Sequence, residues 1–440
     1  MTTPQPPIRP TRVRHIVLWL TVAAYMITYM DRVVISIAAP AMQREFGFST
    51  VALGYMFGAF QLSYALFQIP GGWLGDRFGA RRALTGIVAW WSIFTALTAL
   101  TWSTTSLIAC RFLFGMGEAG AFPNATRSLS RWMLPSERGF AQGITHAGSR
   151  VGGALTPVVV VAIIAEWGWR SPFFIFALVG LVWAAVWFWF YRDTPSEHSM
   201  TNDGERKLIA SALGASSAAG RDRKSVPWGQ LLTSRQLWLL CSTYACYAYV
   251  MGIFLTWFPK YLMDARGFSL QEMGLYASLP LLTAVIGDIC GGSASDYLLK
   301  RSKNLKSSRR TVAIVGYSLA AAAIVPAVLV FNPLIAVGCF CVALFGLELT
   351  VGVSWAITLD IGAEYAGSVA AIMNSSGNLA GASAAALTGY LITLYGWDLA
   401  FLVLAVLCAI ASVLFIRIDA SKQIYSDNEL PELRVIAHTE

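Results

Sequence analysis

The chain has 440 residues, of which 56% are hydrophobic and only 13% are charged. A typical soluble domain carries about 25% charged residues, so a soluble fold of this size could not cover its surface with so few. The same scarcity excludes intrinsic disorder, because disordered chains are rich in charge. Apolar runs such as Ile16–Met30 and Phe173–Tyr191 approach the roughly 20 residues that cross a bilayer. The composition therefore predicts a polytopic helical membrane protein.

Apolar runs taken in chain order predict twelve membrane-spanning helices in two sets of six. The first set is expected at about 16–38, 50–74, 83–101, 105–126, 139–164 and 172–191. The second set is expected at about 237–259, 272–296, 311–331, 334–358, 368–393 and 397–417. The polar stretch between the two sets has no sustained apolar run, which is typical of a surface linker.

The placement of lysine and arginine predicts the orientation of these helices. With the N-terminus in the cytoplasm, 25 of the 32 basic residues fall in tails and cytoplasmic loops, and four fall outside. Cytoplasmic loops carry such an excess, so we expect a multi-pass membrane protein with both termini inside. The net charge of +8 then faces anionic lipid and indicates no nucleic-acid partner. The predicted parts are a cytoplasmic N-terminal tail (1–15), an N-terminal six-helix bundle (16–191), a cytoplasmic linker (192–236), a C-terminal six-helix bundle (237–417) and a cytoplasmic C-terminal tail (418–440).

Two loops repeat a glycine and aspartate motif. Asp76 follows Gly72 by four residues after the second span, and Asp296 follows Gly292 by four residues after the eighth. Repetition between halves is typical of transporters whose halves rock about a central site. We predict a conformational latch made by Gly72, Asp76, Arg77, Gly79, Arg81, Arg82 and Asp296. For the arginines, a solvated loop that only sets topology is the alternative.

The first of these loops resembles the loop motif of the major facilitator superfamily. The match covers Gly72, Leu74, Asp76, Arg77, Gly79, Arg81 and Arg82, and the likeness extends over nearly the whole chain. The resemblance implies an all-α polytopic membrane protein with twelve transmembrane helices in two pseudo-symmetric six-helix bundles. It also implies a central cavity and alternating access.

Ionisable residues inside predicted spans are candidates for function, because charge at that depth costs at least about 2.5 kcal/mol. Arg111 and Glu118 are seven residues apart in the fourth span. Seven residues make almost two helical turns, so both side chains face the same way, about 10 Å apart along the axis. An arginine suits a carboxylate, and a partly desolvated acid can exchange a proton. This stripe predicts proton–anion symport, and a structural ion pair is the alternative.

Further residues resemble the anion:cation symporter family of the same superfamily. They are Tyr29, Asp31 and Arg32 in the first span, and Arg111 followed by Glu118 in the fourth. The resemblance implies that Asp31 and Glu118 couple transport to protons and that Arg111 is central to anion recognition, with Arg32 as a helper. Residues implied to line the cavity are Tyr29, Tyr64, Ser354, Trp355 and Asn374. Asp31 and Arg32 are neighbours, and the sequence leaves open which of them faces the cavity.

The fifth span departs from the sugar-acid carriers of that family, which commonly place a glutamine near the site. Here the polar residues are His146, Ser149 and Arg150. A further cation favours a substrate with two negative groups, although Arg150 is equally suited to neutralise Asp31 or Glu348. Asp288 and Glu348 have no counterpart in the motif, and we leave open whether they couple protons or pair with arginines.

These observations predict a secondary active transporter that takes up a small organic anion, such as a sugar acid, dicarboxylate or sulfonated carboxylate, together with protons. The alternatives are an organic-anion exchanger or uniporter and, less favoured, a drug:proton antiporter. Four scattered histidines and no metal-spaced cluster argue against an enzyme, so we expect no catalytic residues and no metal site. We expect no cofactor besides a coupling H+. The expected partners are the organic anion and the lipid bilayer, and the expected functional unit is a monomer. The identity of the anion and the choice between H+ and Na+ stay open.

Overall fold

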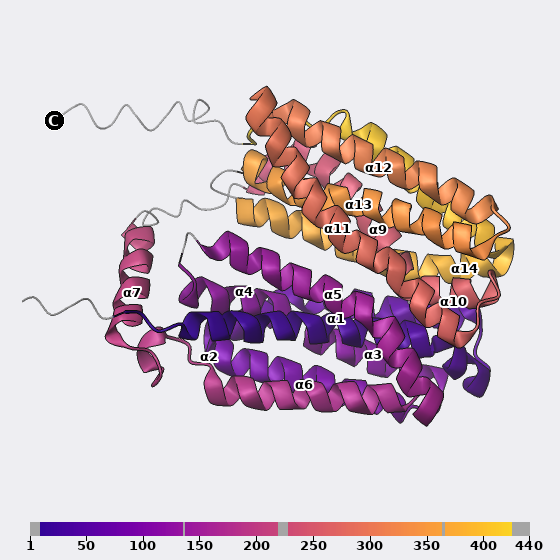
Figure 1. Cartoon of the computed structure of the whole chain (residues 1–440), viewed down its shortest axis with the longest axis horizontal. Helices are drawn as coiled ribbons and strands as arrows, with labels where there is room; N and C mark the ends of the chain where they lie inside the picture. The colour runs from indigo at the N-terminus through magenta and orange to yellow at the C-terminus, as the bar shows by residue number, and fades with distance from the viewer. Residues whose placement is uncertain (1–8, 135–136, 219–227, 363–365, 425–440) are drawn as a thin grey trace, which may run out of the picture. The chain divides into compact units, whose positions relative to one another are not determined.

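The computed structural model describes residues 9–134, 137–218, 228–362 and 366–424 (Figure 1). The described residues form helices and no β-strand. The helices are α1 (Val13–Phe46), α2 (Thr50–Ala99), α3 (Thr104–Glu118), α4 (Ala121–Trp132), α5 (Arg138–Trp167), α6 (Ser171–Phe190), the 3-10 helix η2 (Pro195–Glu197), α7 (Asp203–Ala218), α8 (Trp228–Thr233), α9 (Arg235–Thr256), α10 (Phe258–Asp264), α11 (Leu270–Ser302), α12 (Leu305–Leu329), α13 (Pro333–Gly362) and α14 (Ala366–Phe415). The predicted tails before residue 9 and after residue 424 lie outside the described residues.

The helices accommodate all twelve predicted spans. Within the described ranges, nine helical segments are long and apolar enough to cross a membrane. The backbone of α2 breaks at Gly79 (φ 80°) and that of α14 at Gly396 (φ 81°), which separates the third and twelfth spans from their predecessors. Both turns need a left-handed backbone that glycine adopts without strain. The fourth span is made by α3 and α4 together, and it runs on to Trp132, beyond the predicted end at residue 126.

The chain packs into two compact units, and each is described by itself. Unit 1 comprises residues 1–223, 252–282 and 381–397, and unit 2 comprises residues 224–251, 283–380 and 398–440. The predicted boundaries of the two six-helix bundles stay a prediction.

Capping residues mark the ends of several helices in unit 1. The Ser49 side chain accepts a hydrogen bond from the backbone N–H of Ala52 at 3.2 Å and so caps the start of α2. Ser103 and Ser106 cap the start of α3 reciprocally. Gly47, with φ 66°, ends α1. These residues satisfy backbone groups that a helix end leaves unpaired.

Glycines allow α2 to lie directly against α3 and α4. A Cβ atom at Gly71 would lie 2.6 Å from Cα of Gly120, and a Cβ at Gly75 would overlap the Asn124 side chain. The Asn124 side chain donates to the carbonyls of Gly71 (2.8 Å) and Gly120 (2.7 Å). Small residues permit such close approach of membrane helices. Gly71 and Gly75, which flank Gly72 of the repeated motif, therefore bring the second and fourth spans together.

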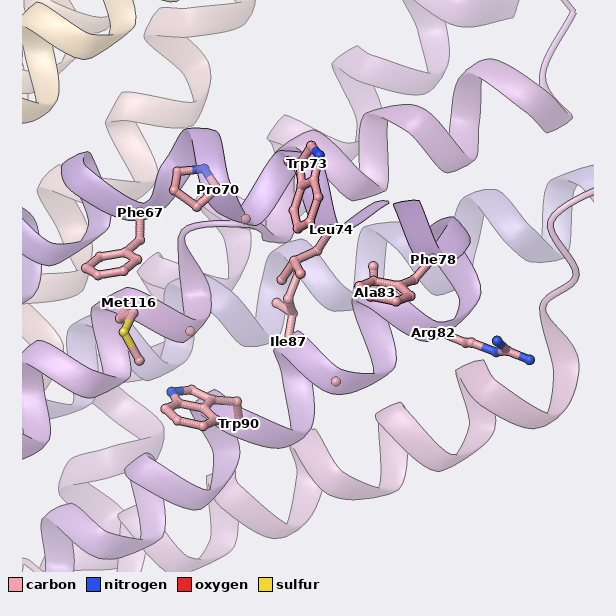
Figure 2. A pocket seen from close by; sticks show the side chains of 13 residues that line it. Phe67, Pro70, Trp73, Leu74, Phe78, Arg82, Ala83, Ile87, Trp90 and Met116 are labelled. Atoms are coloured by element: carbon pink, nitrogen blue, oxygen red, sulfur yellow. The ribbon is translucent and has the colours of Figure 1, made fainter. Parts of the chain in front are cut away.

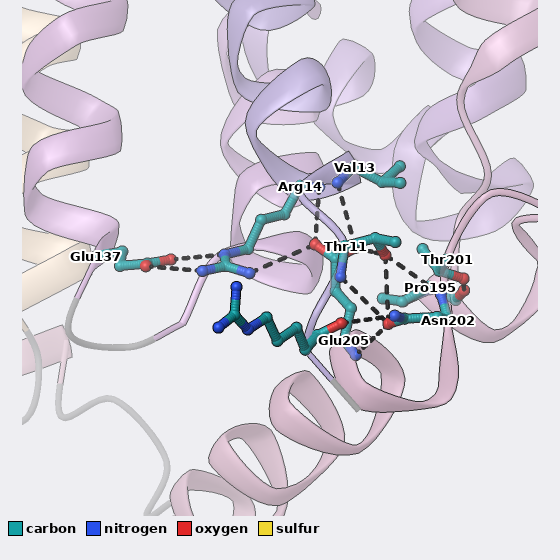
Figure 3. A network of polar contacts seen from close by, with 9 residues as sticks. Thr11, Val13, Arg14, Glu137, Pro195, Thr201, Asn202 and Glu205 are labelled. Atoms are coloured by element: carbon teal, nitrogen blue, oxygen red, sulfur yellow. Dashed lines mark hydrogen bonds and ion pairs between the residues drawn. The ribbon is translucent and has the colours of Figure 1, made fainter. Parts of the chain in front are cut away.

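The start of α1 is held by α7, a helix of the linker (Figure 3). The Glu205 side chain is fully buried and accepts hydrogen bonds from the backbone N–H groups of Val13 and Arg14, both at 3.2 Å. It also accepts from the Thr11 hydroxyl at 2.5 Å. Arg14 bridges Glu205 to Glu137, which precedes α5. Glu205 therefore caps a helix whose own preceding residue offers no side-chain cap.

Unit 1 also joins segments from both halves of the sequence. A Cβ at Gly54 in α2 would lie 3.0 Å from the carbonyl oxygen of Ala385 in α14. The indole N–H of Trp257 donates to the same carbonyl at 3.1 Å. The hydroxyls of Tyr55 and Tyr390 are hydrogen-bonded to each other. All of these residues lie at the predicted outer ends of their spans, so the contacts join those ends.

Candidate functional site

An ion pair between α1 and α3 lies at the centre of the candidate site. Nε of Arg32 donates to Oε1 of Glu118 at 2.5 Å. Glu118 is fully buried, whereas the Arg32 side chain is 13% exposed. The sequence placed Glu118 on one stripe with Arg111, yet its direct partner is Arg32.

Aromatic rings surround the Arg32 guanidinium. Its central carbon lies 4.5 Å from the ring centroid of Tyr64, 5.2 Å from that of Tyr29 and 5.5 Å from that of Phe122. Ring faces attract a cation and exclude water from it. Nη2 of Arg32 is buried and has no hydrogen-bond partner among the described residues. Arg32 thus has a donor left for a further acceptor. The predicted residues Tyr29 and Tyr64 lie beside this donor.

Asp31 is buried in the interior of unit 1. It is 1% exposed and lies beside Trp91, Thr95 and Arg111. Neither carboxyl oxygen has a hydrogen-bond partner within the described ranges. A buried charge without compensation costs several kcal/mol. The charge on Asp31 must therefore be balanced by Arg111 or removed by a proton.

Arg111 is enclosed in the same interior. It is 2% exposed, and its guanidinium carbon lies 4.4 Å from the ring centroid of Phe114 and 5.0 Å from that of Phe60. Glu118 and Asp31 are the acids whose charges act on it most strongly. Arg111 therefore lies near both predicted coupling acids, and Arg32 is more exposed than Arg111.

The fifth span brings its polar residues close to α1. A Cβ at Gly152 in α5 would lie 2.6 Å from the carbonyl oxygen of Met26, so the two helices are in direct contact. Ser149 is buried, and its hydroxyl donates to the carbonyl of His146 at 2.6 Å. Arg150 is half-buried and acts electrostatically on His146. The Ser149 hydroxyl is thus used within its own helix, and a role of Arg150 in binding stays a prediction.

Unit 2 holds the remaining predicted residues. Trp355 is 37% exposed and meets the ring of Tyr244 edge-on at 6.2 Å, and Asn374 is half-buried on α14. Ser354 is buried, and its hydroxyl donates to the carbonyl of Thr350 at 2.8 Å. The Tyr247 hydroxyl donates to Oε1 of buried Glu348 at 2.8 Å. Sequence reasoning did not single out Tyr247, because tyrosine is common in apolar spans.

The first copy of the repeated motif is fixed by a residue that the sequence did not single out. The backbone N–H of Arg81 donates to Oδ1 of Asp193 at 3.2 Å, and Nε of Arg81 donates to the carbonyl of Phe188 at 2.8 Å. A Cβ at Gly79 would lie 2.5 Å from Oδ2 of Asp193. Asp193 follows α6, so it ties the loop between the second and third spans to the end of the sixth. A Cβ at Gly72 would meet the Pro123 side chain at 3.3 Å.

The remaining predicted latch residues of the first copy are Arg77, Arg82 and Asp76. The Arg77 guanidinium lies over the rings of Trp73 (5.3 Å) and Phe78 (5.7 Å). Arg82 is exposed. The side chain of Asp76 lies outside the described part of the structure. A latch role for this copy stays a prediction.

The second copy forms an ionic network in unit 2. Nη1 of Arg309 lies 3.0 Å from Oδ1 of Asp296, and its Nε lies 3.0 Å from Oδ2 of Asp360. Nη1 also donates to the Ser295 hydroxyl at 2.9 Å. Arg309 thus joins α11, α12 and α13 at the ends of three spans.

Replacing Arg309 by glutamine is expected to break this network. Because Asp360 and Arg309 are largely buried, the loss should lower the melting temperature of the detergent-purified protein and slow transport. The matched control is Arg301→Gln, an exposed arginine of the same basic run. Thermal unfolding and uptake rate measure the effect, and equal behaviour of the two variants would show that the network has no role.

Comparison with known proteins identifies the family. The family model of the Major Facilitator Superfamily matches residues 21–385. The chain is 38% identical to the probable sulfoacetate transporter SauU of Cupriavidus necator over 95% of this chain and 96% of that protein. It is 32% identical to the hexuronate transporter of Bacillus subtilis over 94% of this chain and 97% of that protein.

A solved structure shares the fold. It is a bacterial homologue of the human lysosomal transporter Spinster in an inward-facing and unoccupied conformation, with a TM-score of 0.76 and 19% identity. The match covers 93% of this chain and 97% of that one. It confirms the predicted all-α, twelve-helix fold. The predicted resemblance to the anion:cation symporter type of carrier is confirmed as well. The chain therefore belongs to the Major Facilitator Superfamily and is a membrane transporter and not an enzyme.

Proposed function

We propose that the protein takes up a small organic anion together with protons by alternating access. The observation that carries the proposal is the ion pair of Arg32 with buried Glu118 inside a ring of aromatic side chains. A sugar acid, dicarboxylate or sulfonated carboxylate offers the carboxylate that this arginine fits. The relatives named for sulfoacetate and hexuronate support that substrate class.

In the proposed cycle, the Glu118 carboxylate and the substrate carboxylate compete for Arg32. While Glu118 is ionised, its carboxylate holds Nε of Arg32. A proton on Glu118 removes that negative charge, and the guanidinium fork turns to the substrate carboxylate. When the substrate leaves, Glu118 releases its proton and pairs with Arg32 again. Anion binding thereby requires a proton.

Asp31 and Arg111 form a second, buried pair of charges in this proposal. Asp31 takes up the second proton in this proposal, which removes the buried negative charge beside Arg111. We assign the direct anion contact to Arg32 and the coupling of the two acids to Arg111, since Arg32 is the more exposed arginine. Arg150 offers a further cation for a second negative group.

The proposed orientation has both termini in the cytoplasm and the protein as a functional monomer in the bacterial inner membrane. The excess of basic residues in the predicted cytoplasmic loops supports it. Contacts at the predicted outer ends of the spans, such as Trp257 with Ala385, support a conformation of unit 1 that is closed on the outside.

Uptake into proteoliposomes tests the proposed function. With sulfoacetate, glucuronate and glucarate as probes, uptake of the accepted substrate should follow an inward proton gradient and should stop when a protonophore is added. Full uptake without either a proton or a sodium gradient would contradict symport and favour a uniporter. Uptake driven by a sodium gradient would show that Na+ and not H+ is the coupling ion. Counterflow in the absence of any ion gradient distinguishes an exchanger from a symporter and from a uniporter.

A further inference from the structure

A cavity of about 440 Å³ lies in unit 1 between the two arms of α2 and the neighbouring α3 (Figure 2). Its volume lies within the range of roughly 300–1,000 Å³ that small-molecule pockets occupy. The lining is almost wholly apolar and includes Phe67, Leu74, Phe78, Ile87, Trp90 and Met116. The predicted substrate residues are not part of it. The cavity is therefore a second, separate feature of this unit.

Apart from Arg82, the side chains that line the cavity offer few polar groups to a ligand. The indole N–H of Trp90 donates to the carbonyl of Leu113 at 2.9 Å and is already used. Several lining side chains are also exposed on the surface, among them Trp73 (53%) and Phe78 (49%). An exposed apolar surface of this kind suits contact with a partner or a membrane. In a membrane-spanning segment, hydrocarbon is the surrounding solvent.

The length of the cavity matches one leaflet of a bilayer. Its lining runs along α2 from Phe67 to Phe78, which is about 16 Å at the rise of an α-helix. The hydrocarbon core of a bilayer is roughly 30 Å thick, so each leaflet contributes about half of that length. The length and the apolar lining of the cavity therefore suit a single acyl chain.

Arg82 lies at one end of this groove, and Arg77 lies over two of the rings that line it. Arg82 is the charged residue of the lining, and Figure 2 shows it at the end opposite Phe67 and Met116. Arg77 is exposed and lies over the rings of Trp73 and Phe78, which both line the cavity. In the proposed orientation, this end faces the cytoplasmic leaflet, where anionic lipids are found.

We propose that the groove binds one acyl chain of an anionic phospholipid, with the phosphate of its headgroup held by Arg82 and Arg77. The proposal rests on the proposed orientation for the choice of leaflet. The chain would fill the space between the arms of α2, directly beside the turn at Gly79. Lipid would thereby bind the loop whose motif repeats in both halves of the sequence.

Gly86 permits a direct test because it lines the cavity and a Cβ there would meet nothing within 4 Å. Gly86→Phe should fill the groove without disturbing the packing. The matched control is Gly338→Phe in α13, where a Cβ also meets nothing within 4 Å. Gly86→Leu is a smaller version should the phenylalanine variant fail to fold. Arg82→Gln removes a headgroup cation and leaves the apolar lining in place.

Binding of phosphatidylglycerol and phosphatidylcholine to the delipidated, detergent-purified full chain is measured by native mass spectrometry and thermal shift. The unmodified chain and Gly338→Phe should retain phosphatidylglycerol in preference to phosphatidylcholine, and Gly86→Phe should lose this binding. Arg82→Gln should weaken the preference for the anionic lipid by about fivefold. Equal binding by Gly86→Phe and the unmodified chain, or equal binding of both lipids, would overturn the proposal. Neither substrate nor gradient enters this measurement, so its failure is distinct from a failure of proton-coupled uptake.

Discussion

Arg32→Gln is expected to weaken binding of the organic anion by about 10- to 100-fold, the range for loss of a hydrogen bond to a charged group. Arg32 has a donor left over after pairing with Glu118, and it is more exposed than Arg111. Arg32→Lys keeps the charge but loses the planar fork, so we expect an intermediate loss. The half-saturating concentration in counterflow assays measures both effects.

Removal of Arg32 also leaves Glu118 buried without its partner, which is costly by itself. The double variant Arg32→Gln/Glu118→Gln separates the two effects, because it should regain stability without regaining anion binding. Arg44→Gln, at an exposed position of the same helix, is the matched control. A half-saturating concentration unchanged by Arg32→Gln would mean that the ion pair is structural and that the anion binds elsewhere.

The architecture was predictable because it depends on long-range patterns in the chain. Apolar runs determine how many helices cross the membrane, and their positions agree with the helices to within a few residues in most cases. The break between α3 and α4 and the extension of the fourth span to Trp132 were not predictable. Gly120, which lies between α3 and α4, packs against Gly71, a contact between residues far apart in the sequence.

The residues of the candidate site were predictable from the sequence, but the ion pairs that they form were not. Adjacent residues of a helix point about 100° apart, so the sequence left open which of Asp31 and Arg32 faces inward. The packing of α1 against its neighbours decides this and turns Asp31 towards Trp91. The sequence also favoured Arg111 over Arg32 for the anion, because Arg111 shares a helix with Glu118. Geometry between helices, which no spacing encodes, places Arg32 on Glu118 instead.

Partners from distant segments escaped the sequence for the same reason. Asp193 and Asp360 look like ordinary acids at span ends, and Glu205 looks like a surface residue of the linker. Their roles become visible only in the fold, which places Asp193 at Arg81, Asp360 at Arg309 and Glu205 at the start of α1.

Glu118→Gln is expected to abolish proton-driven uptake while substrate exchange across the membrane continues. Glutamine imitates the protonated acid in shape and charge, so Arg32 is released permanently and stays available to the anion. The carrier can then bind and exchange substrate, but it has no proton to give up at this position. Uptake driven by an inward proton gradient should fall to the level of protein-free liposomes, and counterflow should persist.

The pH dependence of exchange gives this prediction a second readout. In the unmodified protein, exchange should slow as pH rises, because ionised Glu118 competes with the anion for Arg32. In Glu118→Gln, that competition is absent and exchange should no longer respond to pH through this residue. Glu166→Gln, at an exposed position near the end of α5, is the control and should retain driven uptake. Proton-driven uptake by Glu118→Gln at the normal rate would exclude Glu118 from coupling and leave Asp31 as the proton carrier in unit 1.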